Sequence, residues 1–203
     1  MNQDSTSRAL PKTARGRATR EKLLQAAERE FGARGFHAVG ISDLTRTAGV
    51  ALGTFYVYFD SKEEIFRALV AYMSDLTRTW VGERVAGATD RISAERQGLE
   101  AYIEFAREHK GIYRIISEAE FVAHDAYIQH YRRFAEAYRK NLAEAAAQGD
   151  IREGDYELWA WAIMGMAVFL GMRYAEWEDS RSGAEVAAGM ADLVERGIGR
   201  VAG

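Results

Sequence analysis

The sequence predicts an all-α protein of one or two compact domains, and three observations indicate this fold class. The chain has 203 residues with 48% hydrophobic side chains, enough to bury a sizeable core. It contains one proline and is rich in Ala, Glu, Arg and Leu, which favour helices. Its apolar residues recur at three- and four-residue steps, the spacing of one helix face, rather than at the two-residue spacing of a strand.

Residues 19–66 contain three short amphipathic segments separated by turn signals. The apolar face of the first segment is formed by Leu23, Leu24, Ala27 and Phe31. We expect this helix to stop at 32–35, where a glycine can take the left-handed conformation of a helix end. The second segment opens with Ser42, a good N-cap residue. Its inward-facing residues are expected to be Ile41, Leu44 and Ala48.

Gly49 breaks the second segment, and the chain restarts within a few residues as a third helix, Leu52 to Tyr58. Two helices joined by so short a glycine-containing turn form a helix-turn-helix, whose second helix can lie in the major groove of DNA. Phe55 and Phe59 form a stripe that is expected to pack on the first two helices. These three segments are therefore interpreted as a DNA-reading head.

The residues of the head resemble a known family. The runs Thr-Ala-Gly-Val (47–50), Gly-Thr-Phe-Tyr-Val-Tyr-Phe (53–59) and Ser-Lys-Glu-Glu (61–64) are similar in order and spacing to the signature of the TetR family of one-component bacterial regulators. The resemblance implies an all-helical homodimer with an N-terminal DNA-binding domain and a larger C-terminal domain that binds an effector and dimerises. We expect a flexible basic arm at 1–17, a helix-turn-helix domain at 18–62 and an effector-binding and dimerisation domain at 63–203.

The expected DNA contacts lie on the head and its arm: Arg17, Arg20, Ser42, Leu52, Gly53, Thr54, Tyr56, Tyr58 and Lys62. The two arginines adjoin the first helix, where basic arms of other helix-turn-helix proteins contact phosphates or the minor groove. Ser42 can offer its hydroxyl or backbone N–H to a phosphate. Gly53 lets the backbone approach DNA closely, and Thr54 can contact a base edge or a thymine methyl.

Three of these roles depend on the family resemblance. It implies that the hydroxyls of Tyr56 and Tyr58 reach phosphates while their rings pack on the head. It also implies a phosphate partner for Lys62, whose charge is unfavourable in the first turn of a helix. Many members of the family have Ser followed by Lys or Arg before the glycine, where this chain has Ala51 and Leu52. This departure removes one donor and one charge from the recognition helix, so no operator sequence is inferred.

A longer helix from Ser61 to about Gly82 spans roughly 30 Å and can tie the head to the body. Further helices are expected near 92–108, 111–119, 124–148, 154–178 and 183–201. The segment 156–177 is apolar nearly all round, and such a helix must be buried on every side. Together with the stripe on the last helix, it predicts a four-helix dimer interface. The residues of that stripe are Val186, Met190, Leu193, Val194, Ile198 and Val201.

The middle of the body is rich in Tyr, Phe, Trp and Met, and most of these side chains are expected to form the core. A cavity between helices would be lined by some of them and would suit a small apolar or aromatic effector, such as an acyl chain or an acyl-CoA. The residues expected to line it are Phe105, Tyr113, Phe121, Tyr131, Met164 and Phe169.

The net charge of −3 conceals an asymmetry that suits one DNA-facing end. Residues 1–62 carry ten Lys and Arg against six Asp and Glu, a charge of +4, whereas residues 63–203 carry −7. The chain has no cysteine, no signal-peptide core and no run of about 18 apolar residues, so we expect a cytoplasmic protein without a membrane partner.

Two other classes of function are weighed against a DNA-binding regulator. One is a helical ligand-binding or protein-interaction module whose head docks protein, and the basic head argues against it. The other is an enzyme, for which Glu120 and His124, four residues apart, are the nearest candidate pair, with His130 following. No catalytic motif, cofactor motif or third metal ligand at helical spacing accompanies them. The sequence therefore predicts no enzyme, no cofactor and no metal site.

Overall fold

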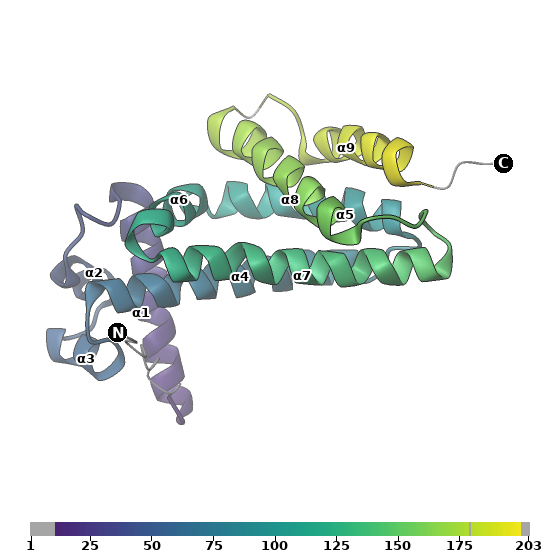
Figure 1. Cartoon of the computed structure of the whole chain (residues 1–203). Coiled ribbons are helices and arrows are strands. Elements are labelled where there is room, and N and C mark those ends of the chain that lie inside the picture. Colours follow the sequence, from purple (N-terminus) through teal and green to yellow (C-terminus); the bar gives the residue numbers. More distant parts are fainter. Residues whose placement is uncertain (1–10, 179, 200–203) are drawn as a thin grey trace.

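The computed structural model describes residues 11–178 and 180–199. Within these residues the regular structure is helical, with one isolated β-bridge between Ile151 and Gly199. The elements are α1 (Ala14–Arg34), α2 (Ile41–Ala48), α3 (Leu52–Tyr58), α4 (Lys62–Val85), α5 (Arg91–Glu108), α6 (Ile112–Val122), α7 (His124–Gln148), α8 (Tyr156–Gly171), the π-helix η1 (Met172–Trp177) and α9 (Gly183–Ile198). Figure 1 shows α1, α2 and α3 at one end of the molecule and α4 and α7 extending away from them. The all-α prediction is confirmed.

The first helix begins earlier than expected. The Thr13 side chain accepts a hydrogen bond from the backbone N–H of Gly16 (3.1 Å), which makes Thr13 the N-cap of α1. Residues 14–17, which we had assigned to the flexible arm, are therefore helical, and residues 1–10 of that arm lie outside the described residues. The helix ends at Gly35, whose φ of 79° is readily available to glycine, close to the predicted position.

The second helix is capped by a residue other than the predicted one. Gly40 is the N-cap of α2, so Ser42 lies inside the first turn with its side chain exposed. The Asp43 carboxylate at N3 accepts a hydrogen bond from the backbone N–H of Gly40 (3.0 Å), which is the part of a capping box that an N3 side chain supplies. Gly49, with φ 67°, ends α2, and the Ser61 side chain caps α4, both as predicted.

An aromatic core holds the head together and continues into the body. The rings of Phe31, Phe55, Phe59 and Phe66 are at most 2% exposed, which confirms that Phe55 and Phe59 face inward. The Phe31 and Phe66 rings meet edge to face at 5.3 Å. The same buried cluster includes side chains of α5 and α6. The head and the nearer half of the body therefore share one core.

The head and the body also meet backbone to backbone. A Cβ on Gly32 in α1 would lie 2.8 Å from the Cα of Gly111, which directly precedes α6. Beside this contact, Glu118 in α6 accepts a hydrogen bond from the backbone N–H of Phe36 (2.6 Å). The Glu28 carboxylate and His109, and the Arg114 guanidinium and the Ala33 carbonyl, form two further pairs across the same joint. The joint between α1 and α6 is thus closely packed.

The outer helices of the body carry an exposed apolar stripe. α8 buries Ala160, Ile163 and Met164 within the subunit. Its opposite face exposes Leu158, Trp161 and Phe169, and α9 exposes Leu193. α8 and η1 together (Tyr156–Trp177) form the one helical run among the described residues whose length and composition would allow it to cross a membrane. The segment 156–177 was expected to be buried on every side, whereas within the subunit α8 leaves one apolar face exposed.

Candidate functional site

The third helix turns one face toward the core and the opposite face toward solvent. Phe55 and Phe59 are buried, and Val57, which lies between them in sequence and across the helix from them, is 63% exposed. A Cβ added at Gly53 would meet no atom within 4 Å. The outward face of α3 therefore combines the exposed Gly53 and Val57 with the half-buried Thr54. This face of α3 is free of charged side chains, and an α-helix fits into the major groove.

The remaining predicted contacts of α3 flank this face. Leu52 and Tyr56 are 49% and 47% exposed on one side. Tyr58, on the other side, is half-buried against the head core. Its hydroxyl lies 3.7 Å from the position of a Cβ on Gly16, in the first turn of α1. Tyr58 thus brings a hydroxyl next to the N-terminus of α1, where phosphate oxygens are favoured.

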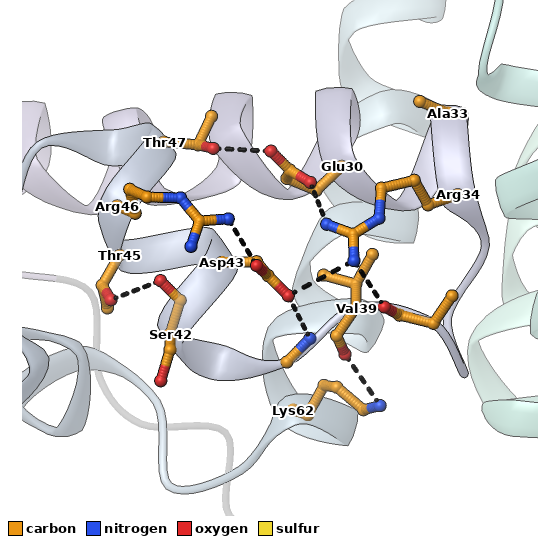
Figure 2. A network of polar contacts seen from close by, with 12 residues as sticks. Glu30, Ala33, Arg34, Val39, Ser42, Asp43, Thr45, Arg46, Thr47 and Lys62 are labelled. Atoms are coloured by element: carbon orange, nitrogen blue, oxygen red, sulfur yellow. Dashed lines mark hydrogen bonds and ion pairs between the residues drawn. The ribbon is translucent and has the colours of Figure 1, made fainter.

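A polar network fixes α2 against the end of α1 (Figure 2). Glu30 accepts hydrogen bonds from the Thr47 hydroxyl (2.6 Å) and from the Arg34 guanidinium (2.9 Å). The bond from Thr47 is the main reason why the pKa of Glu30 lies below its usual value. Asp43 receives the backbone N–H of Gly40 and the Arg46 guanidinium, which lower its pKa to about 2. The network holds the first helix of the helix-turn-helix in place.

Lys62, which is predicted to contact a phosphate, binds the loop between α1 and α2 in the structure. Its ammonium group donates to the backbone carbonyls of Phe36 and Val39, both at 3.0 Å, and lies 4.2 Å from the centre of the Phe36 ring (Figure 2 shows the Val39 bond). In the free protein these two carbonyls are hydrogen-bond partners of the Lys62 ammonium group. The phosphate contact that the resemblance implies stays a prediction. Lys62 connects the start of α4 to the loop between α1 and α2.

Replacing Lys62 by methionine is expected to lower the free energy of unfolding by about 1–2 kcal/mol, because two carbonyls of the loop lose their donor. Chemical denaturation monitored by circular dichroism measures this change. The Lys62→Arg variant serves as the control, since it retains the charge and donors. If Lys62→Met unfolded like the unmodified protein but lost DNA affinity, the phosphate role would be restored.

The two predicted arginines occupy different environments. Arg17 is exposed in the first turn of α1, and its guanidinium donates to the Lys12 carbonyl (2.9 Å). Arg20 is half-buried, with its guanidinium carbon 5.3 Å from the centre of the Phe59 ring. Burial lowers the pKa of Arg20, with Glu64 opposing the shift. Arg20 therefore packs on the head core, whereas Arg17 is presented to solvent.

The body contains a cavity of about 470 Å³ between α4, α5, α6, α7 and α8. Its size falls in the range of roughly 300–1,000 Å³ that is typical of small-molecule sites. Tyr113, Tyr131, Met164 and Phe169 lie in its wall, as the sequence had indicated. The Tyr113 hydroxyl lies 3.4 Å from the Val168 carbonyl oxygen. Burial raises the pKa of Tyr113 and of Tyr131.

Two residues predicted for this wall lie elsewhere. Phe105 is 1% exposed and packs edge to face on Trp80 (5.9 Å), within the core that joins head and body. Phe121 is 85% exposed near the end of α6. Neither residue lines the cavity. Both follow the helical apolar pattern, but this pattern does not tell which neighbouring helix or cavity an apolar side chain will face.

A comparison with known proteins assigns the head. The sequence profile described as "Bacterial regulatory proteins, tetR family" matches residues 23–69, the stretch from α1 into α4 that carries the helix-turn-helix. The head of this chain belongs to the TetR family. Residues 23–69 therefore form a helix-turn-helix DNA-binding domain of this family.

Curated relatives named as HTH-type transcriptional regulators match about half of this chain. The regulator YdgC from Bacillus subtilis is 32% identical over 106 residues, which cover 50% of this chain and 54% of YdgC. The activator FasR from Mycolicibacterium smegmatis is 32% identical over 103 residues, which cover 51% and 47% of the two chains. The matches thus span about half the length of these relatives.

Solved TetR-family structures match the whole fold. A regulator from Rhodococcus sp. superposes with a TM-score of 0.76 at 18% identity, covering 88% of this chain and 97% of that one. AibR, crystallised with isovaleryl coenzyme A and operator DNA, gives a TM-score of 0.67 at 18% identity, covering 86% and 97%. At this level of identity the likeness establishes the fold.

Some residues of this TetR-family site were missed in the sequence. Val57 was overlooked, although its position across the helix from Phe55 and Phe59 is readable from the helical period. Arg91 and His130 line the cavity, but a single arginine or histidine in a helix gives no signal of its own. His124, considered for a metal, is exposed with its ring nitrogen 3.2 Å from the Glu120 carbonyl, and the described residues contain no group of three metal-ligating side chains.

Proposed function

We propose that this TetR-family regulator is a repressor that binds a palindromic operator as a homodimer and is released by a small apolar or aromatic effector. The observation that carries the proposal is the outward face of α3 defined by Gly53, Thr54 and Val57. In this arrangement α3 enters the major groove. Base readout relies on Thr54 and on apolar contact, and hydroxyls such as those of Tyr56 and Tyr58 contact phosphates.

The exposed stripe of α8 and α9 supports the homodimer. On α8 the exposed Leu158, Trp161 and Phe169 follow one another at helical spacing, with Gly165 between the last two. A Cβ at Gly165 would meet no atom of the same subunit, which leaves room for the close approach of a second helix. Two copies of the stripe facing each other across a two-fold axis would cover it, and this explains the membrane-like composition of α8 without a membrane.

Replacing Leu193 by glutamate is expected to raise the dimer dissociation constant at least tenfold, because the charge would be buried twice in a two-fold interface. Sedimentation analysis over a range of protein concentrations in detergent-free buffer measures this dissociation constant. The matched control is Phe121→Glu, which places the same charge on an exposed apolar site outside the stripe. Equal effects of the two substitutions, or no effect of either, would contradict the proposed interface.

The cavity is coupled to the head through α6. Ile112, Tyr113 and Ile116 of α6 line the cavity, while Glu118 of the same helix bonds the loop after α1. An effector that shifts α6 would change the spacing of the two heads, which must match successive major grooves ~34–36 Å apart. A 100-fold loss of operator affinity requires a coupling free energy of only ~2.7 kcal/mol.

Two relatives inform the direction of this response. FasR is named an activator, and AibR was crystallised with isovaleryl coenzyme A and operator DNA together. The repressor role proposed for this chain is therefore drawn from neither protein, and the acyl-CoA of AibR is one candidate effector class. We also place the protein in the cytoplasm, where its operator is accessible.

Duplex binding measured at several salt concentrations tests the proposal. Fluorescence anisotropy with DNA from upstream of the gene should show specific binding whose affinity falls steeply with salt, because phosphate contacts release counterions. Binding to a protein partner with little salt dependence, and no specific duplex, would favour the alternative of a helical interaction module. Unchanged operator affinity after removal of residues 1–60 would contradict a DNA-binding head.

A further inference from the structure

The wall of the body cavity has an asymmetric charge. Among the described residues that line it, the charged side chains are Arg78 and Arg91, and no Asp, Glu or Lys is present. His130 in the wall is neutral near pH 7, because burial lowers its pKa to about 4. The other polar wall groups are neutral hydroxyls and the Asn141 amide. A cationic ligand would find no counterion in this wall. An anion would find Arg91 and Arg78, which lie 2.7 Å from Glu95 and 3.7 Å from Asp75.

Arg91 is the inner of the two cations and has donors to spare. It is the first residue of α5, and its side chain is 12% exposed. Its Nη2 lies 2.7 Å from an oxygen of Glu95, which is 2% exposed and lies behind the wall. Its Nε is buried with no hydrogen-bond acceptor. A guanidinium has five N–H donors, so a single carboxylate leaves most of them unused.

The cavity is elongated, with Arg91 toward one end. On α4 the wall runs from Thr77 to Val85, a rise of ~12 Å, and on α7 it runs from Tyr127 to Asn141, ~21 Å. Arg91 belongs to the end formed by the C-terminal part of α4 and the first turn of α5. The opposite end, nearer the head, is formed by α6 with Ile112 and Ile116.

Parts of the wall on α4 and α7 are exposed to solvent. The exposed wall residues on these helices are Arg78, Gly82, Ala137 and Asn141. Arg78 has 49% of its side chain exposed, so its charge is screened by solvent far more than that of Arg91. An anion would therefore be attracted at the opening by Arg78 and held further in by Arg91.

We propose that the effector of this regulator is an amphipathic monoanion: an apolar chain with one free carboxylate, the carboxylate bound by Arg91 and the chain directed toward α6. This inference rests on the proposed effector role of the cavity. It selects one chemical class among apolar molecules and excludes amines. It also places the apolar end of the effector against the helix that is joined to the head.

A set of four ten-carbon probes tests the assignment: decanoate, decan-1-ol, decylamine and decanoyl-CoA. Isothermal titration at pH 7.5 with the dimeric, DNA-free protein measures each dissociation constant. Decanoate is expected to bind at least tenfold more tightly than decan-1-ol, and decylamine more weakly than both. Tighter binding of decylamine or decan-1-ol than of decanoate would overturn the proposal, as would decanoyl-CoA binding more tightly than decanoate.

A paired variant tests the position of the carboxylate. Arg91→Gln combined with Glu95→Gln removes both charges of the buried pair, so no unpaired charge is left behind. In this variant the preference for decanoate over decan-1-ol should fall to threefold or less, while decan-1-ol affinity stays within threefold of the unmodified protein. A retained tenfold preference would show that the carboxylate is bound elsewhere.

Arg78→Gln is the matched control at the opening and should reduce decanoate affinity by less than threefold. A larger loss there than in the paired variant would move the anion to the opening and overturn the assignment to Arg91. Circular dichroism verifies that both variants fold, and the four-probe comparison needs only the unmodified protein. Specific operator binding without carboxylate binding would refute this inference alone, whereas loss of duplex binding would refute the proposed function.

Discussion

Replacing Phe55 by alanine is expected to lower the free energy of unfolding by ~3–5 kcal/mol, the typical cost of truncating a buried phenylalanine. Phe55 is fully buried, and its ring lies 5.8 Å from that of Phe59. Because the same core continues into α5 and α6, the loss is expected to destabilise the body as well as the head. Urea unfolding followed by circular dichroism measures the free energy of unfolding. The dependence of this free energy on urea concentration is compared between the variants.

The matched control for this prediction is Phe121→Ala. Phe121 is 85% exposed, so the same truncation there should change the stability by less than about 0.5 kcal/mol. A cost below about 1 kcal/mol for Phe55→Ala would show that the ring does not support the core.

Replacing Val57 by glutamate is expected to weaken operator binding by about 30-fold or more and to leave the fold intact. Val57 is 63% exposed on the outward face of α3, so the new carboxylate would be solvated in the free protein. In the complex it would face phosphates, and repulsion from one phosphate ~8 Å away amounts to ~2 kcal/mol at an effective dielectric constant of ~20. Fluorescence anisotropy at fixed salt concentration measures the affinity.

The control for charge is Val57→Gln, which has nearly the same shape as Val57→Glu without the negative charge. It should keep operator affinity within about fivefold of the unmodified protein, since only apolar contact is lost. If both variants bound DNA as tightly as the unmodified protein, the outward face of α3 would not be the DNA-reading surface.

The helices of this fold were predictable because their signals are local. Glycines 49 and 149 end α2 and α7 with positive φ, and apolar residues such as Leu23 and Phe31 recur at the helical period. The start of α1 was placed too late, because the capping bond that the Gly16 N–H donates to the Thr13 side chain precedes the apolar pattern. Boundaries thus follow capping chemistry, which periodicity does not report.

The candidate site was less predictable because its contacts join distant parts of the chain. Lys62 meets the carbonyls of Phe36 and Val39, an encounter that its own surroundings in sequence do not indicate. The pairing of Arg91 with Glu95 is visible as a four-residue spacing, but most such pairs lie on the surface. Which pairs are buried is decided by the packing of other helices.

The contact between Gly32 and Gly111 has a mechanical consequence. No side chain separates the two backbones, so neither segment can slide along the other without atoms colliding. We therefore expect α6 and α1 to move together as one rigid unit. A ligand that is bound in the body cavity and displaces α6 would in this way change the position of α3, which it does not contact.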